Sequence, residues 1–329
     1  MTRILLAAST SLLVFAAHAA EPAPASVKPA TPAPAEASKP KATPQPGPKP
    51  TQADVPYGKH PKQVVDFYKA ESDKPTPVMV YIHGGGWQGG SKNRVGVTSY
   101  LKAGISVVSV EYRFIKEAEA EGIKPPVKAP LEDAARAIQF IRSKASEWNI
   151  DKTRIGATGG SAGACSSLWL AFHDDMADPK SADPVAREST RLTCAAVSGA
   201  QTTLDPRQMK EWTPNSKYGG HAFGFVADPE KKTTQFDEFL AGREKVLAWI
   251  KEYSPYEHVS KGDPAIYLIY NAAPAIGQEQ KDPTHSANFG VKLQEHCQAS
   301  GVECELVYPG APAVKHASAE AFILEKLKK

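Results

Sequence analysis

The chain has 329 residues, of which 41% are hydrophobic and 23% are charged, a composition typical of one large globular domain or two small ones. Its formal net charge of +3 is small, and no basic stripe is interleaved with aromatic residues. Composition and charge therefore argue against a protein that binds nucleic acid or an anionic membrane.

The first residues predict a signal peptide over residues 1–19. Arg3 supplies a short positive segment, and residues 4–17 (ILLAASTSLLVFAA) form an apolar stretch that is too short for a comfortable membrane span. Residues 17–19 (AHA) fit the small-x-small cleavage pattern, and no cysteine that could carry a lipid follows them. We therefore expect a periplasmic or secreted protein without membrane attachment after cleavage; an uncleaved membrane anchor is the alternative.

Residues 20–54 are predicted to be a linker. Ten of the 28 prolines of the chain lie within residues 21–50, and this tract has no apolar periodicity from which a core could form. Such a Pro/Ala/Lys-rich segment is expected to be extended and semi-rigid. It either holds the folded part away from a surface or is only a solvated leader.

Residues 55–329 are predicted to form the folded domain, because strand-like and helix-like segments alternate there. The expected strands lie at 76–84, 103–113, 153–160, 192–200, 264–274 and 303–310, and the expected helices at 130–150, 162–175, 288–301 and 318–329. Several strands are continuous apolar runs, which indicates a parallel sheet covered by helices on both faces. The alternation lapses over 201–263, which we interpret as an insertion that caps the C-terminal edge of the sheet.

A nucleophile motif lies between the third expected strand and the helix after it. Residues 159–163 read Gly-Gly-Ser-Ala-Gly, a G-x-S-x-G pattern centred on Ser161. The strand before it and the helix after it are the context that a nucleophile elbow requires. Ser161 is therefore the candidate nucleophile.

A glycine-rich motif, His83-Gly84-Gly85-Gly86-Trp87, follows the first expected strand. A serine that attacks an ester creates an oxyanion, which needs preorganised N–H donors. One donor is the N–H of the residue after the serine, here Ala162, and others come from a loop of the H-G-G-G form. Glycine suits that loop because its backbone can approach the substrate oxygen closely.

From about Lys59 to its C-terminus the chain resembles an α/β-hydrolase of the esterase/lipase type. It is most similar to the bacterial branch with HGGGW and GxSAG motifs, which includes hormone-sensitive-lipase-like enzymes and esterases of carbohydrate esters. The resemblance implies an α/β-hydrolase fold with a mostly parallel sheet, and an oxyanion hole made by Gly85, Gly86 and Ala162. It also implies that His83 braces the loop.

The family's chain order of serine, acid and histidine locates the other catalytic residues. His316 is the only histidine after the last strand, and it is expected to be the base. Asp282, in the sequence DPTHS before a helix, is the expected acid, with Asp205 as the rival and Glu279 also nearby. Asp263 precedes its strand and so lies at the wrong end of the sheet.

Two further residues are candidates for substrate contact. Trp87 either lines the substrate pocket or packs the glycine loop, and His285 lies beside the expected acid. Tyr218 and His221 of the insertion either shape a pocket or pack the insertion on the domain.

The expected reaction is the hydrolysis of small-molecule or carbohydrate esters, for example acetyl or feruloyl esters, through an acyl-enzyme. It needs no metal or other cofactor, and His and Cys show no metal-ligand spacing. A peptidase of the same fold and a catalytically inactive binding protein are the alternatives. No feature of the sequence specifies an oligomeric state.

An even number of cysteines, here four, suggests two disulfides in an exported protein. Cys297 with Cys304 and Cys165 with Cys194 are the expected pairs, and buried free thiols are the alternative.

Overall fold

The computed structural model describes residues 47–328. The predicted signal peptide 1–19 and most of the predicted linker 20–54 lie outside these residues. Within the described residues, no helix combines the length and the apolar character that crossing a membrane would require.

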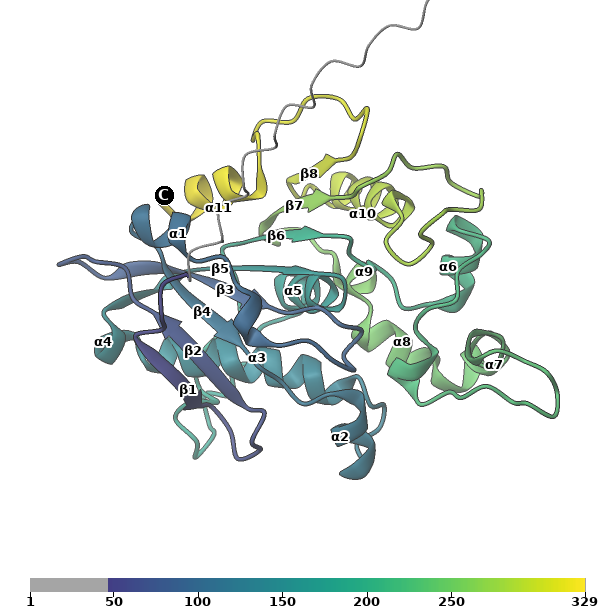
Figure 1. Ribbon diagram of the computed structural model, residues 1–329, viewed down its shortest axis with the longest axis horizontal. Coiled ribbons are helices and arrows are strands. Elements are labelled where there is room, and N and C mark those ends of the chain that lie inside the picture. The colour runs from purple at the N-terminus through teal and green to yellow at the C-terminus, as the bar shows by residue number, and fades with distance from the viewer. Residues whose placement is uncertain (1–46, 329) are drawn as a thin grey trace, which may run out of the picture. The chain divides into compact units, whose positions relative to one another are not determined.

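An eight-stranded sheet forms the centre of the fold (Figure 1). Its strands are β1 (Gln52–Pro56), β2 (Val64–Tyr68), β3 (Thr76–Ile82), β4 (Ser106–Val110), β5 (Ile150–Gly160), β6 (Cys194–Ser198), β7 (Ala265–Ile269) and β8 (Cys304–Val307). Their spatial order is β1-β2-β4-β3-β5-β6-β7-β8. The pairs β1–β2 and β2–β4 are antiparallel, whereas all pairs from β4 to β8 are parallel. The predicted α/β fold with a mostly parallel sheet is therefore confirmed.

Helices cover both faces of the sheet. They are α1 (Thr98–Lys102), α2 (Ile115–Ala120), α3 (Lys128–Ser143), α4 (Ala145–Trp148), α5 (Ala162–Phe172), α10 (Ala287–Ser300) and α11 (Ala319–Lys328), with further helices in the insertion. Side chains alternate along each strand, so Val80 packs in the large core with α3, α5 and α10, whereas Met79 packs in a smaller core with α11. The two cores are the two faces that a parallel sheet has to bury.

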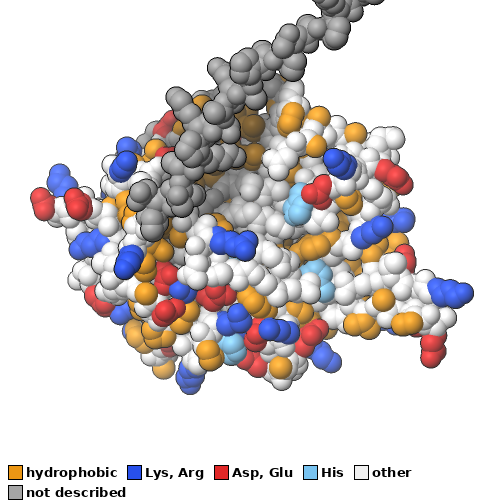
Figure 2. Space-filling model, viewed as in Figure 1, with side chains coloured by type: hydrophobic (Ala, Val, Ile, Leu, Met, Phe, Trp, Pro, Cys, Tyr) orange, Lys and Arg blue, Asp and Glu red, His pale blue; other side chains and the backbone are white. Residues whose placement is uncertain are grey.

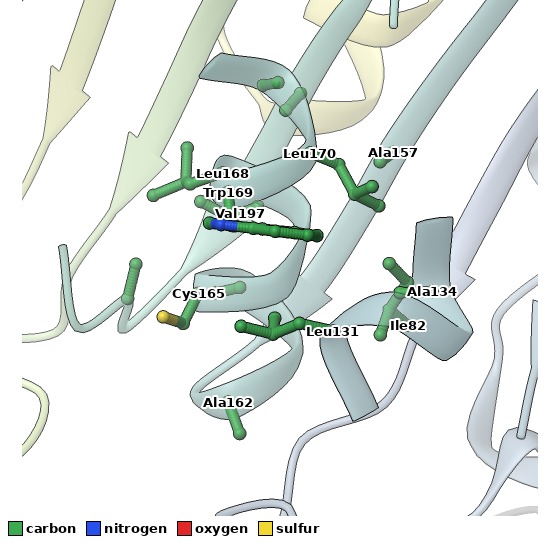
Figure 3. Packing of buried hydrophobic residues seen from close by; sticks show 14 of the residues in the cluster. Ile82, Leu131, Ala134, Ala157, Ala162, Cys165, Leu168, Trp169, Leu170 and Val197 are labelled. Carbon is green, nitrogen blue, oxygen red and sulfur yellow. The ribbon is translucent and has the colours of Figure 1, made fainter. Parts of the chain in front are cut away.

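Helix α5 is the most deeply buried helix that borders the site. All its residues are buried, and Figure 3 shows it between α3, represented by Leu131 and Ala134, and strand residues such as Ala157 and Val197. A helix buried on all sides has apolar or small residues all round. This packing gives the residue that precedes α5 a rigid support.

The expected strands and helices are all present, and most are shorter than predicted. Strands β1 and β2 were not predicted. Strand β1 is mostly exposed and has no apolar run, whereas β2 is buried but only five residues long and is interrupted by Asp66. Since β1 begins at Gln52, regular structure starts three residues before the predicted boundary at 55. The predicted helix 130–150 is divided into α3 and α4, and Asn149 ends α4 in a left-handed conformation with φ 53°.

The insertion 201–263 contains helices and no strand of the sheet. It includes α6 (Pro206–Trp212), η2 (Gly220–Phe223), α7 (Gln235–Gly242), η3 (Arg243–Val246), α8 (Leu247–Tyr253) and α9 (Pro255–His258). Burial lowers the pKa of His221, whose Nε2 lies 2.9 Å from the carbonyl oxygen of Gly86. The insertion thus packs directly on the glycine-rich loop. On the face shown in Figure 2, acidic and basic side chains are interspersed.

Candidate active site

Ser161 lies at the junction of β5 and α5, where the backbone is strained. Its φ of 54° and ψ of −123° fall in a region that residues other than glycine rarely adopt. Its N–H donates to the carbonyl of Ser198 at 3.0 Å, which ties the turn to β6. The strained strand-to-helix turn is the geometry of a nucleophile elbow.

The glycines of the G-x-S-x-G motif are required by close backbone contacts. A Cβ on Gly159 would lie 2.5 Å from the carbonyl oxygen of Ile82, and a Cβ on Gly163 would lie 2.0 Å from the same atom. No real Cβ tolerates such contacts with backbone, so both positions accept only glycine.

His285 is the histidine that contacts Ser161. Its Nε2 lies 2.9 Å from Ser161 Oγ, and its Nδ1 lies 2.8 Å from Asp282 Oδ2. An ionised carboxylate only accepts hydrogen bonds, so Nδ1 carries the proton and Nε2 accepts from the serine hydroxyl. The three side chains thus form one continuous hydrogen-bonded chain.

Asp282 is held as an anion by its neighbours. Partial burial alone would raise its pKa, but the hydrogen bond and the charge of His285, together with the backbone N–H groups of His285 and Thr284, lower the pKa below its ordinary value. The His285 N–H donates to Asp282 Oδ1 at 3.2 Å, so the two residues form a local turn. Asp282 is therefore the carboxylate that orients the imidazole.

The prediction that His316 lies beside Ser161 is wrong. The ring of His316 is buried between two carboxylates, with Nδ1 2.5 Å from Glu305 and Nε2 2.8 Å from Glu325. Tyr267 also donates to its backbone carbonyl at 3.1 Å. The loop after β8 is long enough to carry His316 back to β8 and α11, where it joins an ion-paired cluster.

The other acidic candidates lie elsewhere. Asp205 is the N-cap of α6 and forms a two-pronged ion pair with Arg243. Asp263 pairs with Arg191 at 3.1 Å, at the start of β7. Glu279 is exposed and does not line the pocket of Ser161. Of the acids considered from the sequence, Asp282 alone bonds to a histidine that reaches Ser161.

The glycine-rich loop has its peptide groups aligned by two hydrogen bonds. His83 Nδ1 donates to the carbonyl of Gly84 at 2.9 Å, and the N–H of Gln88 donates to the carbonyl of Gly85 at 3.0 Å. In a trans peptide the N–H points opposite to the C=O, so the N–H groups of Gly85 and Gly86 point away from these partners. Neither donates to another residue of the described chain. Their φ values of 114° and 64° favour glycine, and a Cβ on Gly85 would lie 2.2 Å from the carbonyl oxygen of Gly89.

Trp87 packs the loop and does not line the pocket. Its side chain is fully buried, and its Nε1 donates to Ser166 Oγ at 3.0 Å. Of its two predicted roles, substrate contact is therefore wrong. His83 holds the loop as expected, because its ring stacks on Tyr112 and its carbonyl accepts from the Tyr112 hydroxyl at 2.7 Å.

The loop that carries Asp282 and His285 is fastened to the insertion. Gln201 Nε2 donates to the carbonyl of Thr284 at 2.7 Å. Asn215 donates to the carbonyl of Gln280 at 2.9 Å and accepts from its N–H at 3.0 Å. The position of the base relative to Ser161 thus depends on two amides of the insertion.

Ser161 opens into a pocket of about 510 Å³. Its lining comprises Tyr81, His83, Gly84, Gly85, Gly90, Ser91, Arg94, Gly160, Ser161, Ser198, Gly199, Asn271, Asp282 and His285. A Cβ on Gly199 would lie 3.3 to 3.5 Å from the ring of His285, so this glycine leaves room for the imidazole. The pocket therefore holds the nucleophile, the base and one edge of the glycine-rich loop.

All four cysteines are free thiols in the structure. Cys165 belongs to the core on one face of the sheet and Cys194 to the core on the other, so their predicted pairing is wrong. A hydrogen bond with the Cys297 thiol, together with burial, raises the pKa of Cys304. These two thiols are neighbours, and their oxidation to a disulfide stays a prediction.

Within residues 47–328, one group of potential metal ligands lies outside the pocket. The ligand atoms of His173, Glu252 and His258 lie within 4.8 Å of one another. Spacing in the sequence did not reveal this group, because its members come from the residue after α5, from α8 and from α9. The Nε2 atoms of His173 and His258 already bond to the carboxylate and the carbonyl of Glu252, respectively.

Comparison with known proteins places the chain among esterases. Carboxylesterase NlhH of Mycobacterium tuberculosis is 35% identical over 98 residues, which are 29% of this chain and 28% of that protein. Esterase LipC of the same organism is 28% identical over 238 residues, which are 68% of this chain and 51% of that protein. The chain thus spans between about a quarter and half of the length of these relatives.

Solved structures share the fold. A truncated carbohydrate esterase from gut microbiota superposes with a TM-score of 0.62 at 20% identity, covering 84% of this chain and 96% of that one. The model of the BD-FAE family, an α/β-hydrolase esterase family, matches residues 65–282, a range that includes both motifs, Asp282 and the five strands β3 to β7 in full. The chain therefore belongs to the BD-FAE family of esterase/lipase-type α/β-hydrolases.

Proposed function

We propose that the protein is a serine esterase that hydrolyses carboxylic esters through an acyl-enzyme. Ser161 is the nucleophile, His285 is the general base and Asp282 is the orienting acid. The observation that carries the proposal is the hydrogen-bonded chain from Ser161 Oγ through the His285 ring to Asp282, with distances of 2.9 and 2.8 Å. His285 takes the role that the sequence analysis gave to His316.

Acylation begins when His285 Nε2 removes the proton of the Ser161 hydroxyl as Oγ attacks the ester carbonyl. The negative charge that develops on the carbonyl oxygen is stabilised by the N–H groups of Gly85, Gly86 and Ala162. His285 then gives its proton to the departing alkoxide, and Asp282 stabilises the imidazolium in the meantime. The products of this half-reaction are the free alcohol and acylated Ser161.

Deacylation uses the same groups in reverse. His285 removes a proton from a water molecule, whose oxygen attacks the acyl carbonyl. The second oxyanion faces the same N–H groups, and its collapse returns the proton from His285 to Ser161 Oγ. The acid product leaves and the hydroxyl of Ser161 is restored.

Carbohydrate esters, such as acetyl or feruloyl esters, are the proposed substrates. The hydrogen-bonding side chains of Ser91, Ser198 and Asn271 in the pocket lining and the likeness to a solved carbohydrate esterase support this choice. A peptidase would use the same triad, so the two activities are separated by assay. Turnover is measured with 4-nitrophenyl acetate, acetylated and feruloylated oligosaccharides, and peptide 4-nitroanilides.

The test compares the wild type with Ser161→Ala. We expect kcat for ester hydrolysis to fall by at least about 10⁴-fold in the variant. Ser198→Ala is the matched control, because it removes a second serine hydroxyl that lines the pocket and leaves the hydrogen bond from Ser161 to His285 in place. Absence of any Ser161-dependent ester turnover would overturn the proposal in favour of a binding protein.

Export is proposed as well, on the basis of the sequence of residues 1–19. When the full chain is produced in a Gram-negative host, we expect mature protein in the periplasm or medium with an N-terminus at Ala20 or Glu21. Protein that retains residues 1–19 and sediments with membranes would contradict export as a free protein.

A further inference from the structure

The pocket of Ser161 contains a guanidinium group that the proposed acyl transfer does not use. Arg94 ends the short helix η1 (Lys92–Arg94), which follows the glycine-rich loop, and its exposed side chain lines the pocket. Within residues 47–328, Arg94 makes no hydrogen bond and no ion pair. The only other charged or titratable groups in the lining apart from Tyr81 are His83, Asp282 and His285, and all three are bonded to other protein groups.

Arg94 differs in this respect from every other arginine of the described chain. Each of the other eight donates to a carboxylate or to a backbone carbonyl: Arg113, Arg136, Arg142, Arg154, Arg187, Arg191, Arg207 and Arg243. Its neighbour Lys92 is buried and pairs with Asp54 and Asp66 at 3.0 and 2.7 Å. The charge of Lys92 is thus neutralised within the fold, while that of Arg94 is left for a group outside it.

A second donor lies close to Arg94 in the same pocket. Tyr81, on β3, is half-buried and lines the pocket, as do Ser91 and Asn271. Burial raises the pKa of Tyr81, and the charge of Arg94 opposes that rise, so the phenol and the guanidinium are electrostatic neighbours. At neutral pH the phenol is protonated and can donate a hydrogen bond.

We infer that Arg94, assisted by Tyr81, binds a carboxylate group carried by the ester substrate. A guanidinium presents two parallel N–H groups that match the two oxygens of a carboxylate. The inference rests on the proposed esterase function and narrows its substrate class to acidic esters. The carboxylate belongs either to the acyl part, as in a half-ester of a dicarboxylic acid, or to the alcohol part, as in an ester next to a sugar acid or an aromatic acid.

Two matched pairs of substrates distinguish these sources. The acyl-side pair is mono-4-nitrophenyl adipate and its methyl ester, which differ only in the charge of the distal carboxyl. The alcohol-side pair is 4-acetoxybenzoate and methyl 4-acetoxybenzoate. For each pair, kcat/KM is measured with wild type, Arg94→Gln and Arg94→Lys, and with Arg187→Gln as a control that removes an exposed arginine outside the pocket.

We expect wild type to prefer the anionic member of one pair, and Arg94→Gln to lower kcat/KM for that member by about tenfold or more. The same variant should change kcat/KM for the neutral esters by less than about twofold, and Arg94→Lys should keep part of the preference. The preference should also weaken as salt rises to 1 M, because the Debye length falls to about 3 Å.

Equal effects of Arg94→Gln on charged and neutral members of both pairs would overturn the inference. That result leaves Ser161-dependent turnover of neutral esters intact. If the esterase proposal itself were wrong, none of the four esters would show Ser161-dependent turnover. The two failures are therefore distinguishable.

Discussion

The assignment of the base to His285 predicts opposite outcomes for two histidine variants. His285→Ala removes the only histidine ring that contacts Ser161 Oγ in the described chain. We expect kcat for 4-nitrophenyl acetate to fall by about 10⁴-fold or more, which is about 5.5 kcal/mol of transition-state stabilisation at 25 °C. His316→Ala should leave kcat within about threefold of wild type, because the ring of His316 bonds to Glu305 and Glu325 instead.

Stability should respond in the reverse order. The side chains of His316 and Glu305 are only 5% and 9% exposed, and removal of one partner of a buried pair costs about 3–5 kcal/mol. At about 2 °C per kcal/mol for a domain of this size, His316→Ala should lower Tm by about 6–10 °C. The His285 side chain is 39% exposed, so His285→Ala should cost less than about 1 kcal/mol.

Both variants are measured by initial rates at 25 °C and by thermal unfolding followed with circular dichroism. The assignment of the base to His285 is wrong if His316→Ala loses activity while it keeps its Tm, or if His285→Ala retains more than about a tenth of wild-type kcat. A third variant, His316→Gln, preserves hydrogen bonding in the cluster and should recover part of the lost Tm without any change in kcat.

Four further outcomes are expected. Because His285 holds the pKa of Asp282 below its ordinary value, the pair stabilises the fold above about pH 4 and loses that contribution only as the pH falls through the lowered pKa. The Tm difference between wild type and Asp282→Asn, measured by thermal unfolding, should therefore be constant above about pH 5 and shrink progressively on acidification below about pH 4. Gly86→Val, at a φ of 64°, should lower kcat far more than it raises KM. Gly89→Val is the control, because a Cβ at this loop position would have no atom within 4 Å. Asn215→Ala removes both hydrogen bonds to Gln280 and should lower kcat about tenfold with little change in Tm. An unchanged kcat would show that the loop keeps its conformation without these bonds. Under oxidising conditions Cys297 and Cys304 should resist alkylation until reduction, while four alkylated thiols in unreduced protein would exclude the disulfide.

The contiguous motifs were predictable because backbone geometry dictates their composition. Gly159 and Gly163 have carbonyl oxygens where a Cβ would be, and Gly85 has a positive φ, so each position shows in the sequence as an obligatory glycine. The parallel strands were predictable for a similar reason, since burial on both faces demands unbroken apolar runs. Strand β1 lacks that demand, because it is a mostly exposed edge strand.

The base was not predictable by the same means. Ser161 and His285 are 124 residues apart, and their contact depends on the path of a loop rather than on a local pattern. A local signal did exist, because Asp282 and His285 are three residues apart, a spacing that a single turn brings together. Successive side chains of β6 point to opposite faces of the sheet. Ala195 faces the core that contains Cys165, so Cys194 faces the other core. This alternation could have excluded the disulfide between Cys165 and Cys194.

The placement of Asp282 and His285 on one loop gives the insertion a role beyond covering the pocket. If acid and base came from two loops, each would be positioned by its own strand. Here both depend on one segment between β7 and α10, most of which is exposed. Gln201 and Asn215 hold that segment from the insertion side, and His221 bonds to the carbonyl of Gly86. The insertion therefore contacts both the loop that carries the base and the loop that carries the oxyanion donors, so changes in its packing should alter turnover before they alter stability.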